Sequence, residues 1–165
     1  MNIRKIDTCD AIYYVLDEER FPHLLECMVA EGEVKKKRNG EYTVVLLNGR
    51  DFSGNTYTDP YSERFEWIAG FSDSNPDLCV ALQLVSVSQD TVELVNCEKN
   101  GDERRVFPQI VEWIQHRYPG KSVSTFPMNS DLEEYYSGFG FRKDGDMLVK
   151  IGTEVDFRGS GELSS

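Results

Sequence analysis

One helical segment set between two strand-like segments constrains the fold of this chain more than any other feature. Apolar residues recur three or four positions apart over Val106–Tyr118, and Pro119-Gly120 ends the pattern, so an amphipathic helix is predicted there. Strands are predicted on either side of it, over Thr91–Cys97 and Lys121–Phe126. Most other strand-like segments follow one another as antiparallel hairpins do. A strand–helix–strand unit inside such a run predicts a mixed, mostly antiparallel, twisted α/β sheet flanked by helices.

The length of 165 residues suits one domain, because domains hold roughly 150 residues. We expect that domain to cover residues 1–151, and the polar residues 152–165 to form a flexible tail. The basic run Lys35–Gly40 predicts a solvated turn, and the polar segment Asp51–Arg64 predicts a long loop. Further strands are predicted over residues 2–6, Tyr42–Leu47, Phe65–Phe71, Cys79–Val87, Phe141–Lys143 and Met147–Ile151, and further helices after Thr8 or Asp10, from Pro22 to Gly32, and over Asp131–Ser137 behind a cap at Asn129 or Ser130.

Acidic residues outnumber basic ones by 29 to 18, which gives a formal net charge of −11 at pH 7. That balance argues against direct binding to the phosphates of nucleic acid, which calls for a basic surface. It permits a cationic substrate or a basic partner. No apolar run approaches the about 20 residues of a membrane-spanning helix, and the first residues lack the apolar core of a signal peptide. We therefore expect a cytoplasmic protein that has neither membrane nor nucleic acid as a direct partner.

The cysteines and histidines do not predict a metal site. No Cys-x-x-Cys pair occurs, and the histidines form no zinc-ligand pattern with the cysteines. Each cysteine lies in an apolar stretch, which favours reduced and buried thiols. Both histidines lie near the ends of predicted helices and are interpreted as structural. The cysteines are Cys9, Cys27, Cys79 and Cys97, and the histidines are His23 and His116.

The segment 129–141 carries the most informative motif, an Asn followed at fixed spacing by an apolar residue, two aromatic residues and a Gly-Phe pair. This motif resembles the late signature of the GNAT family, whose members are N-acyltransferases that use acetyl-coenzyme A (acetyl-CoA). The order of predicted elements from residue 2 to residue 151 is also similar to the GNAT fold. The resemblance therefore implies a GNAT-like sheet and acyl transfer to an amine. The matching residues are Asn129, Leu132, Tyr135, Tyr136, Gly140 and Phe141.

The resemblance implies two catalytic residues. Tyr136 falls on the position of the tyrosine that protonates the thiolate as it leaves the thioester. A carboxylate on the strand before the cofactor loop acts on the amine, and Glu93 is the first candidate, with Glu66 second. The residues alone leave an alternative open, in which Tyr136 only packs against the sheet while Tyr135 faces outward, and Glu93 is an exposed polar residue.

The resemblance also places the cofactor pyrophosphate at the loop after the Thr91–Cys97 strand, where backbone N–H groups and a helix N-terminus hold it. Of the family's loop pattern only Gly101 matches, because Glu98 and Glu103 stand where an amide or basic residue and a second small residue are expected. A carboxylate about 5 Å from a phosphate charge costs roughly 3 kcal/mol at an effective dielectric near 20. Pro108 further predicts that the helix begins late. The cofactor contacts expected are Val95, Cys97, Lys99, Gly101, Arg104, Arg105 and Asn129.

Two functions from different classes follow from these observations. The first is an N-acyltransferase that moves an acetyl group from acetyl-CoA directly to an amine acceptor. The acidic balance favours a cationic small molecule or a protein Lys as that acceptor. The second is a GNAT-like binding module without catalysis, whose acidic surface docks a basic protein partner.

Overall fold

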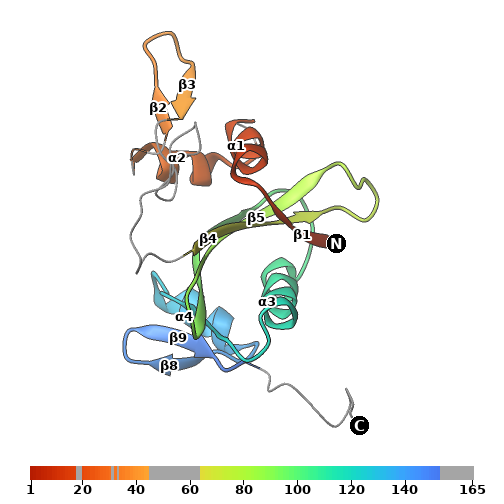
Figure 1. The fold of residues 1–165 in the computed structure, drawn as a ribbon, viewed down its shortest axis with the longest axis vertical. Coiled ribbons are helices and arrows are strands. Elements are labelled where there is room, and N and C mark those ends of the chain that lie inside the picture. The colour runs from red at the N-terminus through yellow and green to blue at the C-terminus, as the bar shows by residue number, and fades with distance from the viewer. Residues whose placement is uncertain (18–19, 31, 33, 45–63, 153–165) are drawn as a thin grey trace.

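The computed structural model describes residues 1–17, 20–30, 32, 34–44 and 64–152. Its main body is a seven-stranded sheet with the order β1-β4-β5-β6-β7-β9-β8, and β2 and β3 form a separate two-stranded hairpin that projects beyond α2 (Figure 1). The elements are β1 (Asn2–Ile6), α1 (Thr8–Leu16), α2 (Pro22–Ala30), β2 (Val34–Lys36), β3 (Tyr42–Val44), β4 (Arg64–Phe71), β5 (Cys79–Val87), β6 (Thr91–Lys99), α3 (Val106–Arg117), β7 (Ser122–Thr125), α4 (Ser130–Ser137), β8 (Arg142–Asp144) and β9 (Met147–Lys150).

The sheet is antiparallel except for the pair β6 and β7, which are connected by α3. A parallel pair needs a crossover connection, and the amphipathic helix predicted over this segment supplies it. Helices α1 and α2 lie on one side of the sheet and α3 lies on the other (Figure 1). The structure therefore confirms the predicted mixed, mostly antiparallel α/β sheet flanked by helices.

The two faces of the sheet are covered by separate cores. Strand β5 lies between them and all of its residues are buried, which suits its nearly continuous apolar sequence. The core under α1 and α2 includes Phe21, Leu24, Trp67, Phe71 and Leu84, and the core under α3 and α4 includes Val92, Leu94, Ile110, Ile114, Tyr136 and Leu148.

A β-bulge in β6 interrupts the regular pairing of this strand with β5. The partner of Leu84 is Asn96 but the partner of Val85 is Leu94, so Val95 is the extra residue. The buried Gln83 amide donates to the carbonyl oxygens of Leu84 and Asn96, at 2.9 and 3.1 Å, which stabilises the irregular backbone. A bulge bends its strand and increases its twist, so β6 leaves the regular sheet at this point.

Several local expectations are corrected by the structure. Asp7, not Thr8 or Asp10, caps α1, because its carboxylate accepts the N–H of Asp10 at 2.8 Å. Helix α3 does not begin late, since Pro108 lies in its first turn, where a missing N–H breaks no helical hydrogen bond. The basic turn contributes a strand of its own, β2, because its first residues pair with β3.

Two predicted segments lie largely outside the described residues, and the prediction that all four cysteines are buried is wrong. Except for Arg64, the predicted Asp51–Arg64 loop lies outside the described residues, as does the predicted tail beyond Gly152. Cys9 is exposed rather than buried, and Cys79 alone of the cysteines is fully buried. In the described ranges, no helix is both long enough and apolar enough to cross a membrane.

Candidate functional site

A cavity of about 630 Å³ opens where β6 and β7 separate. The two strands pair in parallel only from Thr91 and Ser122 to Leu94 and Thr125. Beyond the bulge β6 continues to Lys99 while β7 ends, so the edge of β6 is left without its neighbour. The walls of the cavity come from the end of β6, the segment after β7, the start of α3, one side of α4 with Leu132, Tyr135 and Tyr136, and His23 at the start of α2.

The cavity brings together most of the residues expected at the site. Tyr136, Val95, Cys97, Lys99 and Arg105 all line it. The other expected residues lie around it rather than in its wall: Gly101 and Arg104 line a neighbouring pocket, Asn129 caps α4, and Glu93 lies on the paired part of β6, opposite Ser86 and Ser124.

Tyr136 is held with its hydroxyl at the cavity wall. The side chain of Asn129 accepts the N–H of Leu132 at 2.9 Å and so fixes the start of α4. The helix then buries Tyr136, which is 6% exposed, while Tyr135 is 43% exposed. Tyr136 thus packs against the sheet and Tyr135 is the more exposed ring, as the packing alternative has it, but packing is not the only contact of Tyr136, because both side chains line the cavity.

The hydroxyl of Tyr136 is hydrogen-bonded to two side chains of the site. The Thr125 hydroxyl donates to it, and it donates to the Cys97 thiol. Burial raises the pKa of Tyr136 far above its ordinary value, and the nearby Cys97 raises it further. The phenol therefore keeps its proton at neutral pH, as a proton donor must.

Cys97 is placed beside Tyr136 but is not activated. Burial raises the pKa of its thiol to about 11, against a smaller lowering by the Tyr136 hydrogen bond. The thiolate is the nucleophilic form of cysteine, so little of it is present at neutral pH. The chemistry of this site therefore favours direct transfer over a covalent intermediate on Cys97.

The start of α3 offers a set of groups suited to anions. Arg105 precedes the helix in the left-handed conformation, with φ 56° and ψ 36°, and no other described non-glycine residue has a positive φ. The Gln109 amide donates to the carbonyl oxygens of Arg104 and Arg105, at 3.1 and 3.0 Å, and holds this turn. The first N–H groups of a helix have no partner within it, and at α3 they lie next to Lys99 and Arg105. Such a set fits a diphosphate, although Pro108 removes one donor.

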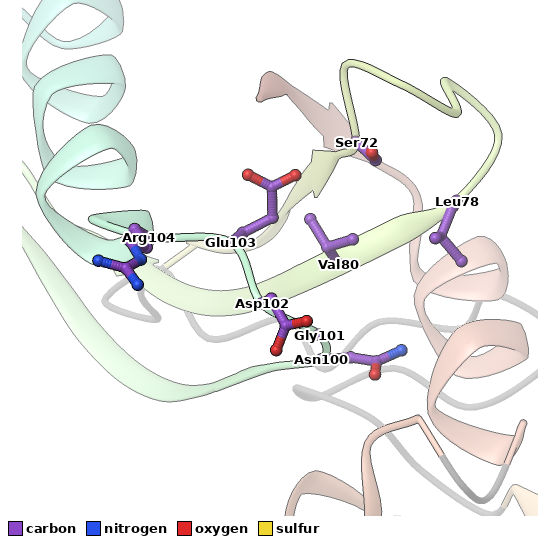
Figure 2. Close-up of a pocket in the computed structure, with 8 residues that line it drawn as sticks. All are labelled: Ser72, Leu78, Val80, Asn100, Gly101, Asp102, Glu103 and Arg104. Atoms are coloured by element: carbon purple, nitrogen blue, oxygen red, sulfur yellow. The ribbon is translucent and has the colours of Figure 1, made fainter.

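The acidic residues of the loop do not stand where the sequence placed them. Glu98 points to the other face of the sheet, where its Oε1 accepts the N–H of Leu24 in α2 at 2.9 Å. Glu103 lines the neighbouring pocket of about 470 Å³, between the 72–78 and 100–104 segments, with Arg104 at the base of α3 (Figure 2). The Lys99 ammonium donates to the carbonyl oxygen of Glu103 at 3.0 Å, so the loop is tied back to β6.

Neither carboxylate that the sequence suggested as a base lines the cavity. Glu66 is 4% exposed, accepts a hydrogen bond from the Tyr118 hydroxyl and lies 3.2 Å from the Lys5 ammonium. Burial and this hydrogen bond raise the pKa of Tyr118. The acidic group in the cavity is instead Glu98, and His23 lies in the same wall. The sequence predicted neither Glu98 nor His23 as part of the cavity wall, and the only local signal was the position of His23 directly after Pro22.

No protein-family model matches the sequence, and no curated protein matches it significantly. The ribosomal-protein-S18-alanine N-acetyltransferase from Escherichia coli superposes with a TM-score of 0.50 at 11% identity, over 99% of this chain and 98% of that one.

Two further structures are similar at a lower score. Escherichia coli ElaA has a TM-score of 0.49 at 16% identity, over 91% of this chain and 99% of that one. A GNAT-family protein from Bacteroides thetaiotaomicron has a TM-score of 0.48 at 15% identity, over 98% of this chain and 93% of that one. At such identities the likeness concerns the fold alone, and the GNAT-like fold of this chain is shared with the ribosomal-protein-S18-alanine N-acetyltransferase.

Proposed function

We propose that this protein is an acyl-CoA-dependent N-acyltransferase that moves an acetyl group from acetyl-CoA to an amine. The observation that carries the proposal is the placement of Tyr136 in the wall of a cavity that also receives the basic start of α3. Acetyl-CoA lying along the open edge of β6 would have its phosphates next to the start of α3 and its thioester next to Tyr136, the proton donor. The GNAT fold supports this arrangement.

Each group at the cavity has a defined part in the proposed reaction. Lys99, Arg105 and the N–H groups of α3 bind the phosphates, while Val95 and Cys97 line the path of the cofactor arm. When bound, acetyl-CoA supplies an activated acyl carbon. The neutral amine attacks that carbon, the C–N bond forms as the C–S bond breaks, and Tyr136 gives its proton to the departing sulfur. The proton that the amine nitrogen loses passes through water to Glu93 and then to solvent, and solvent returns a proton to Tyr136.

Four other residues act from outside the cavity in this proposal. Arg104 adds positive charge at the base of α3, and Gly101 lets the loop turn, with a φ of +94°. Asn129 fixes the start of α4 and thereby the position of Tyr136. Glu93 remains a proposed base only through an intervening water, because it does not line the cavity.

The proposed acceptor is a cationic amine, either a small molecule or a protein Lys. The net charge of −11 attracts cations over a distance. A structure with the same fold acts, by its name, on an alanine of a ribosomal protein, so a protein amine is compatible with the fold. No disulfide forms among the four cysteines, which supports a reducing, cytoplasmic setting.

A second candidate function is a binding module without catalysis, whose acidic surface docks a basic protein. The observation that favours it is the start of α3, which lacks the second small residue of the family loop and loses one N–H to Pro108. In that case the cavity would no longer bind acetyl-CoA.

Calorimetric titration with acetyl-CoA separates the two candidates. The enzyme binds acetyl-CoA saturably, and the release of free coenzyme A with amine acceptors reports turnover. We expect Tyr136→Phe to lower turnover about 10²–10⁴-fold with an unchanged dissociation constant for acetyl-CoA, because the donated proton is lost but not the binding groups. Tyr135→Phe is the matched control and should retain full turnover. A fully active Tyr136→Phe variant would refute the assignment of Tyr136, and no binding of acetyl-CoA would favour the binding module.

A further inference from the structure

The cavity has a second wall that the binding of acetyl-CoA does not use. Side chains alternate along a strand, so Cys97 and Lys99 face the α3 and α4 side while Glu98 faces α2. The basic groups thus lie on one side of β6, and a carboxylate and an imidazole, Glu98 and His23, lie on the other. Both of these line the same cavity.

Glu98 is oriented but not neutralised. Its Oε1 accepts the N–H of Leu24 at 2.9 Å, which fixes the carboxylate against the first turn of α2. A carboxylate has a second oxygen and further lone pairs to offer. Within the described ranges, no Lys or Arg forms an ion pair with Glu98. The cavity therefore contains a half-buried negative charge with room for a cation beside it.

His23 directly precedes Leu24 and so lies next to the Glu98 carboxylate. Its Nε2 lies 3.7 Å from the Sγ of Cys27, one turn further along α2, which limits the orientations of the ring. A neutral imidazole presents one nitrogen as a hydrogen-bond acceptor. Glu98 and His23 together offer a negative charge and a neutral acceptor, which match the charge and the several N–H donors of an alkylammonium group.

We infer that Glu98 and His23 form a subsite for the alkylammonium group of the acceptor, with Glu98 as its counter-ion and His23 as a hydrogen-bond acceptor. The inference rests on the proposed acyl transfer and names the acceptor class, a primary alkylamine, which is recognised as the ammonium ion and attacks only after it has lost that proton to water. The subsite lies on the α2 side of β6 and the phosphate groups on the α3 side, so acceptor and acetyl-CoA reach the open edge of the strand from opposite faces. An acceptor with a carboxylate next to its amine is disfavoured, because that carboxylate would meet Glu98.

The histidine content of the chain provides a direct assay. His23 and His116 are its only histidines, so ring-labelled protein gives two sets of imidazole NMR signals. His116 lies near the end of α3, where its Nδ1 donates to the Glu112 carbonyl oxygen at 2.8 Å, and it serves as an internal control. The probe is 1,4-diaminobutane at pH 8, with 1,4-butanediol as its neutral counterpart.

The diamine should shift the His23 signals saturably and leave those of His116 in place, and the diol should shift neither. Glu98→Gln keeps an oxygen for the Leu24 N–H but removes the charge, so it should weaken diamine binding at least tenfold. A second variant, Asp90→Asn, removes an exposed carboxylate in the turn before β6, outside the cavity wall, and should leave the binding unchanged. Equal shifts of both histidines, no shift, or an unaltered affinity in Glu98→Gln would overturn the subsite.

The same samples are titrated with acetyl-CoA by calorimetry, which keeps the two proposals apart. Glu98→Gln should bind acetyl-CoA with the affinity of the wild type. Diamine binding at His23 without acetyl-CoA binding would refute the acyltransferase and leave a cation site. Acetyl-CoA binding without a diamine response at His23 would refute the subsite alone.

Discussion

Replacing Arg105 by glycine separates backbone strain from ligand binding at the start of α3. Arg105 is held at φ 56° and ψ 36°, in the left-handed region. That region costs a residue with a Cβ atom about 1–2 kcal/mol, whereas glycine adopts it freely. Glycine in turn loses about 0.5–1 kcal/mol more chain entropy on folding. We therefore expect Arg105→Gly to raise the free energy of unfolding by about 0.5–1 kcal/mol.

The same substitution should weaken the binding of acetyl-CoA. A guanidinium about 5 Å from a phosphate charge contributes roughly 3 kcal/mol at an effective dielectric near 20. Screening at physiological salt reduces this value, since the Debye length is about 8 Å. We expect a loss of about ten- to a hundredfold in affinity, largest at low salt. A variant that is more stable but binds worse would show that the strain at Arg105 serves the ligand.

Urea denaturation and calorimetric titration at about 50 and 500 mM NaCl measure the two effects. Arg105→Lys is the matched control, because it keeps both the charge and the strained backbone, and its stability should equal that of the wild type. Equal affinity of Arg105→Gly and wild type at low salt would show that Arg105 does not face the phosphates. A loss of stability in Arg105→Gly would refute the strain argument.

Three further predictions test neighbouring parts of the account. Glu103→Gly should change acetyl-CoA affinity less than threefold in calorimetry, because Glu103 lines the neighbouring pocket, and a large gain would place its charge beside the phosphates after all. Asn129→Ala should lower the free energy of unfolding by about 1 kcal/mol in urea denaturation through loss of the α4 cap, and an unchanged value would contradict the capping role. Burial raises the pKa of the Cys79 and Cys97 thiols from 9.0 to about 11, so the stability that they contribute is complete below pH 9 and falls as the pH rises to 11. The free energy of unfolding is measured in urea at pH 8 and at pH 11 for the wild type and for Cys97→Ser. Between these two pH values the variant should lose about 1–2 kcal/mol less of it than the wild type. Equal losses would contradict the burial assigned to Cys97.

The sequence predicted the features that depend on neighbouring residues. The apolar period over Val106–Tyr118 predicts α3, and a helix between two strands predicts the parallel pair, because both signals are local in the chain. The motif that includes Tyr136 predicts a buried tyrosine at the site, since an Asn cap and helical spacing decide which face of α4 meets the sheet.

Features that depend on distant parts of the chain could not be predicted in this way. The loop pattern predicts that Glu98 opposes the cofactor phosphates, but a backbone N–H at Leu24, 74 positions away, holds it on the other face of the sheet. The extra residue in β6 follows from its register with β5 and from the amide of Gln83. The left-handed backbone at Arg105 carries no sequence signal, because arginine does not favour that region.

Hydrogen exchange with and without acetyl-CoA tests most directly whether the cavity between β6 and β7 is the acetyl-CoA site. We predict slower exchange in peptides that cover Val95–Lys99, the first turn of α3 and the 125–136 segment, because these residues line the cavity. Peptides that cover the 72–78 segment of the neighbouring pocket should exchange at unchanged rates. Slower exchange confined to that neighbouring pocket, or no change anywhere in the chain, would contradict the account.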